Sequence, residues 1–213
     1  MCGRYAIADI SPEFAGLFLP TDFRPTLDAR PTDPLPVIRR NADGALICEL
    51  RRWGFQREWP GPNGKWMKRT LFNAVAEEVT QKRAFKQAFL TARCIIPINA
   101  WYEWVDTPQG KQRYRLGMPQ RACFGAAGLF EAGKDSQSGA PTACFTMLTV
   151  APGENSPLSN VHDRAPMILA AADYETWLDA DAHVAQALLE PYADQDAFSV
   201  EPYQTPPAES LLF

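Results

Sequence analysis

Residues 93–117, RCIIPINAWYEWVDTPQGKQRYRLG, decide the fold of this chain. The first half is an apolar run rich in isoleucine and aromatic residues, which is typical of a buried β-strand. The tetrapeptide Thr107-Pro108-Gln109-Gly110 is a turn signal, and the residues after it again suit a strand. We therefore expect strands at 93–104 and 113–117 that flank this turn.

Strand-like runs dominate the rest of the chain, and helices are few. We expect further strands at 35–40, 45–55, 123–130, 142–150 and 165–170. Helices are predicted at 80–91, 172–179 and 183–190, and a short amphipathic helix is expected to begin at Ser11-Pro12-Glu13 and to include Phe14 and Phe18. No internal repeat or linker interrupts the chain. The prediction is one α+β domain over 1–213, a curved antiparallel, barrel-like sheet with a few peripheral helices.

Composition limits the classes of protein to which the chain can belong. Its 213 residues are 46% hydrophobic, enough to bury a core, yet no apolar run approaches the length of a membrane span. The N-terminus lacks a secretion signal pattern, so we expect a cytoplasmic protein without a membrane partner. The sequence contains no obvious dimer motif, and we expect a monomer. Five cysteines without a CxxC pair argue against a disulfide framework, and two histidines argue against a conventional zinc site. We expect no cofactor.

The net charge of −4 conceals an asymmetry along the chain. Residues 171–213 contain nine acidic residues and no Lys or Arg, whereas residues 1–170 carry a net charge of +5. We expect the acidic part to pack on the rest of the domain. The overall charge therefore does not exclude a nucleic-acid partner, which would depend on local charge.

Residues 51–69 combine positive charge with aromatic rings. They include six basic residues, one acidic residue and half of the tryptophans of the chain: Trp53, Trp59 and Trp66. Basic groups neutralise phosphates, and aromatic faces stack on unpaired bases. This composition fits single-stranded DNA. It also fits a solvated strand edge with core tryptophans, and we expect Trp53 to be partly in the core and Trp59 to be exposed.

Cys2 follows the initiator methionine directly. If Met1 is removed, one carbon carries both an α-amine and a thiol arm, and such a 1,2-aminothiol can close a thiazolidine ring with an aldehyde. The unperturbed pKa values of both groups are about 8 to 8.5, so a nearby base or positive charge could activate either one. Alternatively, Cys2 is an incidental residue at a frayed terminus.

Four short blocks in this order resemble the SRAP family of SOS-response-associated peptidases, or abasic-site-processing proteins. The blocks are Met1-Cys2-Gly3-Arg4-Tyr5, Leu71-Phe72-Asn73-Ala74, Ala100-Trp101-Tyr102-Glu103-Trp104 and Val161-His162-Asp163-Arg164-Ala165-Pro166. The resemblance extends over most of residues 1–180 and implies the same curved sheet fold.

The resemblance also implies a catalytic set of Cys2, Asn73, Glu103 and His162. In this scheme Asn73 orients the amine or the opened sugar, although its place before a helical stretch would also suit a cap. Glu103 lies among three aromatics, which should desolvate it and raise its pKa, unless it faces outward on an alternating strand. His162 would transfer protons on the sugar, although a lone histidine can also be structural.

The implied reaction is covalent capture of the ring-opened aldehyde of an abasic site by Cys2, with β-elimination as a further activity. The expected partner is single-stranded or junction DNA that contains abasic sites, contacted by Arg4, Trp53, Trp59 and Arg164. Three positions depart from the pattern of the family, namely Val75, Ala100 and Asp28, where arginine, glycine and asparagine are usual. These departures concern DNA affinity more than the chemistry.

Two other functions fit the same residues. Cys2, His162 and Glu103 could form a cysteine peptidase set whose minimal activity is removal of Met1. Alternatively, the chain could be a DNA-binding module that recognises damage without reacting with it.

Overall fold

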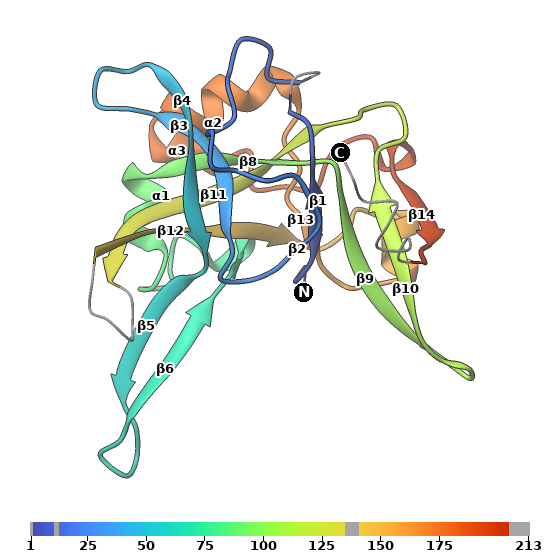
Figure 1. The fold of residues 1–213 in the computed structure, drawn as a ribbon, viewed down its shortest axis with the longest axis horizontal. Helices are drawn as coiled ribbons and strands as arrows, with labels where there is room; N and C mark the ends of the chain where they lie inside the picture. The colour runs from blue at the N-terminus through green and yellow to red at the C-terminus, as the bar shows by residue number, and fades with distance from the viewer. Residues whose placement is uncertain (1, 11–12, 135–140, 205–213) are drawn as a thin grey trace.

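The computed structural model describes residues 2–10, 13–134 and 141–204. Strands make up most of its regular structure, and its helices are short (Figure 1). This arrangement confirms the predicted fold class. None of the helices in these ranges is long and apolar enough to cross a membrane.

Five strands close into a barrel. They follow the order β11-β8-β3-β4-β12, and β12 returns to pair with β11. Their bounds are β3 (Pro34–Arg40), β4 (Leu46–Trp53), β8 (Arg93–Ile98), β11 (Phe124–Lys134) and β12 (Pro141–Val150). The pairing is antiparallel except between β12 and β4, and β12 also pairs in parallel with the short β7 (Asn73–Val75). The expectation of an antiparallel sheet is therefore right for most pairs and wrong for these two.

A second sheet packs beside the barrel, and it has the order β14-β10-β9-β1-β2. Its strands are β1 (Tyr5–Ile7), β2 (Thr26–Ala29), β9 (Ala100–Thr107), β10 (Gly110–Gly117) and β14 (Ser199–Pro202). The predicted strand at 93–104 is thus two strands, which belong to different sheets and separate at Asn99. The amide side chain of Asn99 accepts a hydrogen bond from the Ala8 amide at 2.6 Å and donates to the Asp9 and Ala122 carbonyls, which fixes this change of sheet.

Two hairpins project from the same side of the molecule, and the start of β1 lies between their bases (Figure 1). One is the predicted β9–β10 hairpin. The other consists of β5 (Phe55–Pro60) and β6 (Trp66–Leu71), and it was not predicted. The first residues of the chain therefore lie between two projecting arms.

The helices are shorter than expected. They are α1 (Lys86–Thr91), α2 (Tyr174–Asp179) and α3 (Ala182–Gln186), with 3₁₀ turns at Ala76–Glu78, Pro157–Asn160, Ala171–Asp173 and Gln195–Ala197. Only β13 (Ala165–Pro166) forms within the strand expected at 165–170.

Trp177 attaches the acidic C-terminal part to the barrel. It is fully buried, its indole donates to the Cys94 carbonyl at 2.9 Å, and its ring lies 6.1 Å from that of Phe89. At the other end of this part, β14 extends the second sheet along β10. The acidic C-terminal part, as far as residue 204, therefore packs on the rest of the chain through Trp177 and β14.

Candidate active site and nucleic-acid interface

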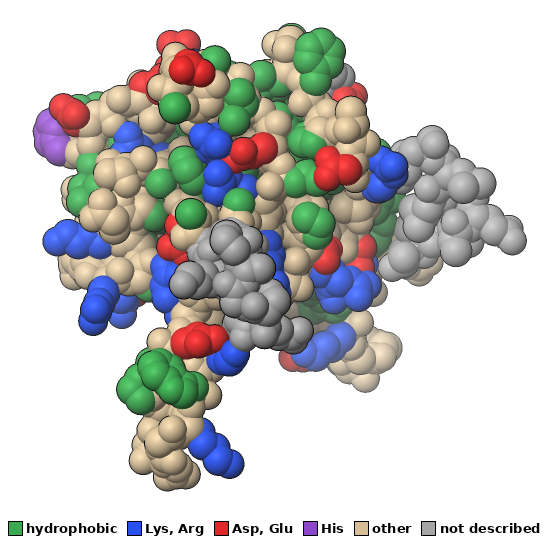
Figure 2. Space-filling model, turned by 60° about the vertical axis from the view of Figure 1, so that its left-hand side comes forward, with side chains coloured by type: hydrophobic (Ala, Val, Ile, Leu, Met, Phe, Trp, Pro, Cys, Tyr) green, Lys and Arg blue, Asp and Glu red, His purple; other side chains and the backbone are tan. Residues whose placement is uncertain are grey.

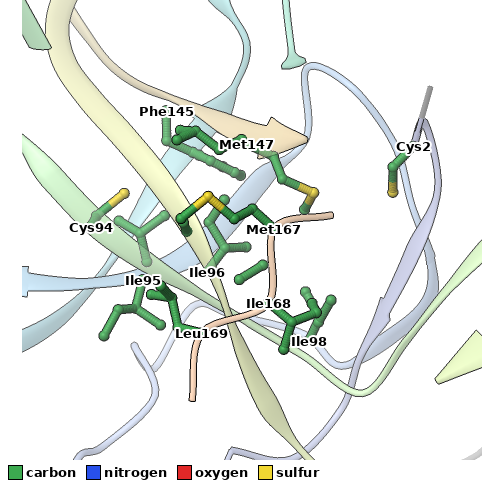
Figure 3. Packing of buried hydrophobic residues seen from close by; sticks show 14 of the residues in the cluster. Cys2, Cys94, Ile95, Ile96, Ile98, Phe145, Met147, Met167, Ile168 and Leu169 are labelled. Atoms are coloured by element: carbon green, nitrogen blue, oxygen red, sulfur yellow. The ribbon is translucent and has the colours of Figure 1, made fainter. Parts of the chain in front are cut away.

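Cys2 is buried at the edge of the core, just before β1. Its side chain is fully inaccessible to solvent, and Figure 3 shows it at one side of the cluster of buried hydrophobic residues, apart from Cys94. The thiol donates a long hydrogen bond to the Arg4 carbonyl, with Sγ 3.7 Å from the oxygen. Burial, and then the nearby carboxyl of Glu103, raise the pKa of the Cys2 thiol far above its usual value. The thiol is therefore protonated at neutral pH.

Asn73 fixes the backbone of Cys2. It begins β7, whose parallel pairing with β12 places Asn73 beside Met147. Its side-chain Nδ2 donates a hydrogen bond to the Cys2 carbonyl at 2.7 Å. Its Oδ1 is buried and has no hydrogen-bond partner in the described part of the chain, which leaves an acceptor next to residue 2. Asn73 therefore lies in a strand and contacts Cys2, and the alternative that it caps a helix is wrong.

Glu103 lies on the core face of β9. Side chains alternate across a strand, so Glu103 shares a face with Trp101, which packs against Phe124 and Phe198. Only 5% of Glu103 is exposed. Burial, with a further contribution from the charge of Asp163, raises the pKa of Glu103 to about 7. Both protonation states of the carboxyl are therefore well populated at neutral pH, and the alternative of an outward-facing glutamate is wrong.

His162 lies in the loop between the 3₁₀ turn at 157–160 and β13. Two groups compete for its Nδ1: the Arg164 amide at 2.9 Å and the Asp163 carboxylate at 2.7 Å. An amide N–H can donate only to an unprotonated Nδ1, whereas the carboxylate needs a protonated one. Burial lowers the pKa of His162, which favours the neutral ring. We therefore assign the proton to Nε2 and regard Nδ1 as the acceptor.

The charge of Asp163 connects this loop to Glu103. It acts on the pKa of both His162 and Glu103. Glu103 also acts on the thiol of Cys2, whereas His162 is linked to Glu103 only through the charge of Asp163. Asn73 joins them through its hydrogen bond to Cys2. Among the described residues, no group of three or more His, Cys, Asp and Glu side chains is arranged to hold a metal ion.

Trp53 requires a correction. It was predicted to contact DNA, but it is fully buried, and its indole donates to the Phe72 carbonyl at 2.8 Å. Its ring packs against Tyr5, Phe72 and Phe145. The Trp53 ring therefore fills the core at the end of β4, and neither of its faces is accessible to a base.

Arg4 and Arg164, two of the predicted DNA contacts, both face carboxylates. Arg164 donates two hydrogen bonds to Glu77, at 2.9 and 2.7 Å, and a third to the Thr149 carbonyl, so it anchors the loop that carries His162. Arg4 lies 3.8 Å from Asp28 and is partly exposed. Of the two, only Arg4 has a guanidinium that is loosely held beside Cys2.

The β5–β6 hairpin carries the exposed part of the basic-aromatic segment. Its exposed large apolar side chains are Trp59, Trp66 and Met67. Figure 2 shows the hairpin protruding from the body, with hydrophobic and Lys or Arg side chains gathered on it. Trp66 is 65% exposed, more than the 37% of Trp59. Trp59 is exposed as expected, whereas Trp66 was not singled out. The Asn63-Gly64 turn signal between the two tryptophans could have revealed the hairpin.

Basic residues of the segment divide into two groups. Arg51 and Arg57 are held by Glu49 and Glu131 near the barrel. By contrast, the basic residues on the second half of the hairpin are exposed, namely Lys65, Lys68 and Arg69, although Lys68 lies 3.0 Å from Glu58. The hairpin, more than the whole of 51–69, is the candidate nucleic-acid interface.

Comparison with known proteins finds a matching family model, similar relatives and a similar fold. The family model of the SOS response associated peptidase (SRAP) matches residues 1–205. The abasic site processing protein YoaM of Bacillus subtilis is 33% identical over 215 residues, which cover 96% of this chain and 90% of that protein. YoqW of the same organism, with the same description, is 31% identical over 214 residues, 96% of this chain and 92% of the relative. A crystal structure of a protein from Bordetella bronchiseptica superimposes with a TM-score of 0.79 at 24% identity, covering 96% of this chain and all of the other, and so supports the fold.

Proposed function

The chain belongs to the SOS response associated peptidase (SRAP) family, and on that premise we propose that it processes abasic sites in single-stranded DNA by covalent capture. The relatives that it matches over nearly their whole length are named abasic site processing proteins. The observation that carries the proposal is the position of Cys2. Its carbonyl is held by Asn73, and its thiol lies within electrostatic reach of a carboxyl whose pKa is about 7.

Removal of Met1 gives Cys2 a free α-amine, which is the first nucleophile. An ordinary α-amine has a pKa of about 8 and is partly neutral near pH 7, whereas the buried thiol is protonated. The amine adds to the C1′ aldehyde of the opened sugar, and the carbinolamine loses water to form an imine. The open acceptor on Asn73 suits an N–H of this amine.

Ring closure follows at the same carbon. Sulfur bonds to C1′ and the thiol proton leaves, while the imine nitrogen gains a proton, so that the thiazolidine differs from the reactants by one water. Glu103 serves both steps. In its acid form it protonates the departing hydroxyl, and as a carboxylate it accepts the thiol proton.

The imine also permits strand cleavage. It acidifies C2′, and loss of that proton forms a C2′–C3′ double bond as the 3′ phosphate leaves. We assign His162 to proton transfer on the sugar. Its neutral ring carries a donor on Nε2, and its Nδ1 accepts a hydrogen bond from the backbone of its own loop. Lyase activity would therefore compete with ring closure by the thiol.

Intact mass spectrometry after mixing with an abasic oligonucleotide tests the proposal. The expected species is the chain without Met1 plus the oligonucleotide minus one water. An oligonucleotide with a tetrahydrofuran abasic analogue lacks the aldehyde and should give no adduct. Peptide cleavage alone would identify a peptidase, and binding without a change in mass would identify a non-reacting module. Either result would overturn covalent capture.

The hairpin should contribute binding energy through its exposed tryptophan. Trp66→Ala is expected to weaken binding of undamaged single-stranded DNA at least fivefold, because stacking of one base contributes about 1–3 kcal/mol. Arg69→Gln should reduce the slope of log Kd against log salt by about 0.7, as expected for one phosphate contact. Fluorescence anisotropy over a salt series measures both effects.

Phe18→Ala provides the control for this prediction. Phe18 is 88% exposed but lies outside the hairpin, so its loss should leave Kd unchanged. Equal effects of Phe18→Ala and Trp66→Ala would contradict a specific role of the hairpin.

A further inference from the structure

Three arginines converge on Asp28, at the end of β2. Arg30 Nη2 lies 2.6 Å from one carboxylate oxygen of Asp28, and Arg113 Nη2 lies 2.9 Å from the other. Arg4 Nε approaches that second oxygen to 3.8 Å. The Asp33 carboxylate also lies beside Arg30, because its Oδ2 accepts a hydrogen bond from the Arg30 amide at 2.8 Å. Two negative charges therefore face three positive charges in this group, the Asp28 cluster, which leaves a net charge of +1.

Aromatic rings hold Arg113 in place. Its guanidinium carbon lies 3.8 Å from the ring centre of Tyr102, 5.1 Å from that of Tyr203 and 5.2 Å from that of Trp104. A guanidinium stacked in this way keeps the orientation of its N–H groups. Arg113 therefore presents a fixed set of donors toward Asp28.

The other charges along β10 come as opposite pairs and do not offset this excess. Lys111 lies 3.9 Å from Asp106, and Arg115 stands across from Glu201 in the β10–β14 register. Beside the cluster, 38% of Trp104 is exposed, which leaves part of its indole accessible to a planar ligand. The second projecting arm, like the first, thus combines positive charge with an exposed tryptophan.

The cluster adjoins the proposed reaction centre. Arg4 is two residues from Cys2, and its carbonyl accepts a hydrogen bond from the Tyr102 amide at 3.0 Å, next to Glu103 on β9. Arg30 directly follows Ala29, which pairs with Tyr5 across β1 and β2. The positive group therefore lies where the β9–β10 arm meets the start of the chain (Figure 1).

We infer that the Asp28 cluster is a binding site for a backbone phosphate of the DNA strand that flanks the abasic site, and that Asp28 occupies this position in the free protein. The inference rests on the proposed function. A carboxylate and a phosphate accept the same paired N–H donors of arginine, so the strand can replace the Asp28 side chain when that side chain rotates away. Trp104 then stacks on a neighbouring base, and Asp28 lowers the affinity for DNA because it competes for the same arginine donors.

Asp28→Asn tests the inference, because it removes the competing charge while retaining the shape of the side chain. Binding of undamaged single-stranded DNA, measured by anisotropy at low salt, is expected to tighten about fivefold. Asp106→Asn makes the same change in charge on an exposed carboxylate at the tip of the arm, and it should change Kd less than twofold. Equal effects of the two variants, or weaker binding by Asp28→Asn, would overturn the inference.

Arg30→Gln gives a second test, in which a loss of binding cannot be attributed to misfolding. Arg30 is 60% exposed on its side chain, so the variant should fold normally. It is expected to weaken binding and to reduce the salt slope by about 0.7. An unchanged slope would argue against a phosphate at the cluster. Adduct formation by the unaltered chain is measured in parallel, and its failure would instead count against covalent capture at Cys2.

Discussion

Cys2→Ala is expected to abolish the heat-stable adduct with abasic DNA and to leave an imine that borohydride can trap. The substitution removes the thiol but keeps the α-amine, so the first bond still forms and the ring cannot close. Without ring closure the imine persists, and strand cleavage by β-elimination should continue. An N-terminal extension that is not removed blocks the amine instead, and it should abolish both the adduct and the trapped imine.

This pair of variants separates the two nucleophiles of one residue. Denaturing gels with and without borohydride measure the stable and the trapped species on the same samples. Cys94→Ala is the matched control, because Cys94 is as deeply buried as Cys2 and its truncation leaves a similar cavity, at a cost of about 1 kcal/mol. It should retain the adduct. A heat-stable crosslink formed by Cys2→Ala would show that another residue is the nucleophile.

The pattern of apolar residues predicted the strands of the barrel well, because these strands are buried and therefore consist mostly of apolar side chains. The run from Arg93 to Ile98 is buried at every position, and the apolar sequence predicts that directly. The change of sheet at Asn99 and the parallel pairing of β12 with β4 and β7 could not be predicted. They depend on which distant strands meet, and the sequence of one strand does not encode its partner.

The β5–β6 hairpin escaped prediction for the opposite reason. Most of its residues from 58 to 69 are exposed, so they show no alternation between core and solvent. The predicted helix at 80–91 was too long at its start. α1 begins at Lys86 after a series of turns, and no side chain caps its N-terminus. Thr80, the first residue of the predicted helix, was expected to cap it and does not.

At the site, residue types were predictable and contacts were not. Aromatic neighbours indicated a desolvated Glu103, and the structure supplies the burial that raises its pKa. Trp53 and Trp66 illustrate the limit. Both lie in one basic segment, yet one fills the core and the other is exposed, because the first precedes the point where β5 leaves the barrel. Sequence composition cannot locate that point.

Glu103→Gln is expected to slow adduct formation by about 10²–10⁴-fold near neutral pH, with DNA affinity unchanged. Glutamine can neither protonate the leaving hydroxyl nor accept the thiol proton, but it preserves the size and polarity of the side chain. The rate of the unaltered chain should depend on an ionisation near pH 7, and the variant should lose this dependence. Quenched time courses at saturating abasic DNA over pH 5.5–8.5 measure it. A variant with the same pH profile would remove Glu103 from the proton transfers.

The same substitution has a second readout, which does not involve DNA. The pKa of Glu103 is about 7 in the folded chain against 4.5 ordinarily, so between these values the folded state binds more protons than the unfolded state. The stability of the unaltered chain relative to Glu103→Gln should therefore fall as pH rises from about 4.5 to 7, by up to about 3 kcal/mol, and stay constant above. Urea unfolding of both chains across this range measures the difference. If the difference in stability between the two chains does not change with pH, the Glu103 carboxyl is not held at a raised pKa, and a proton donor for the loss of water must be sought elsewhere in the site.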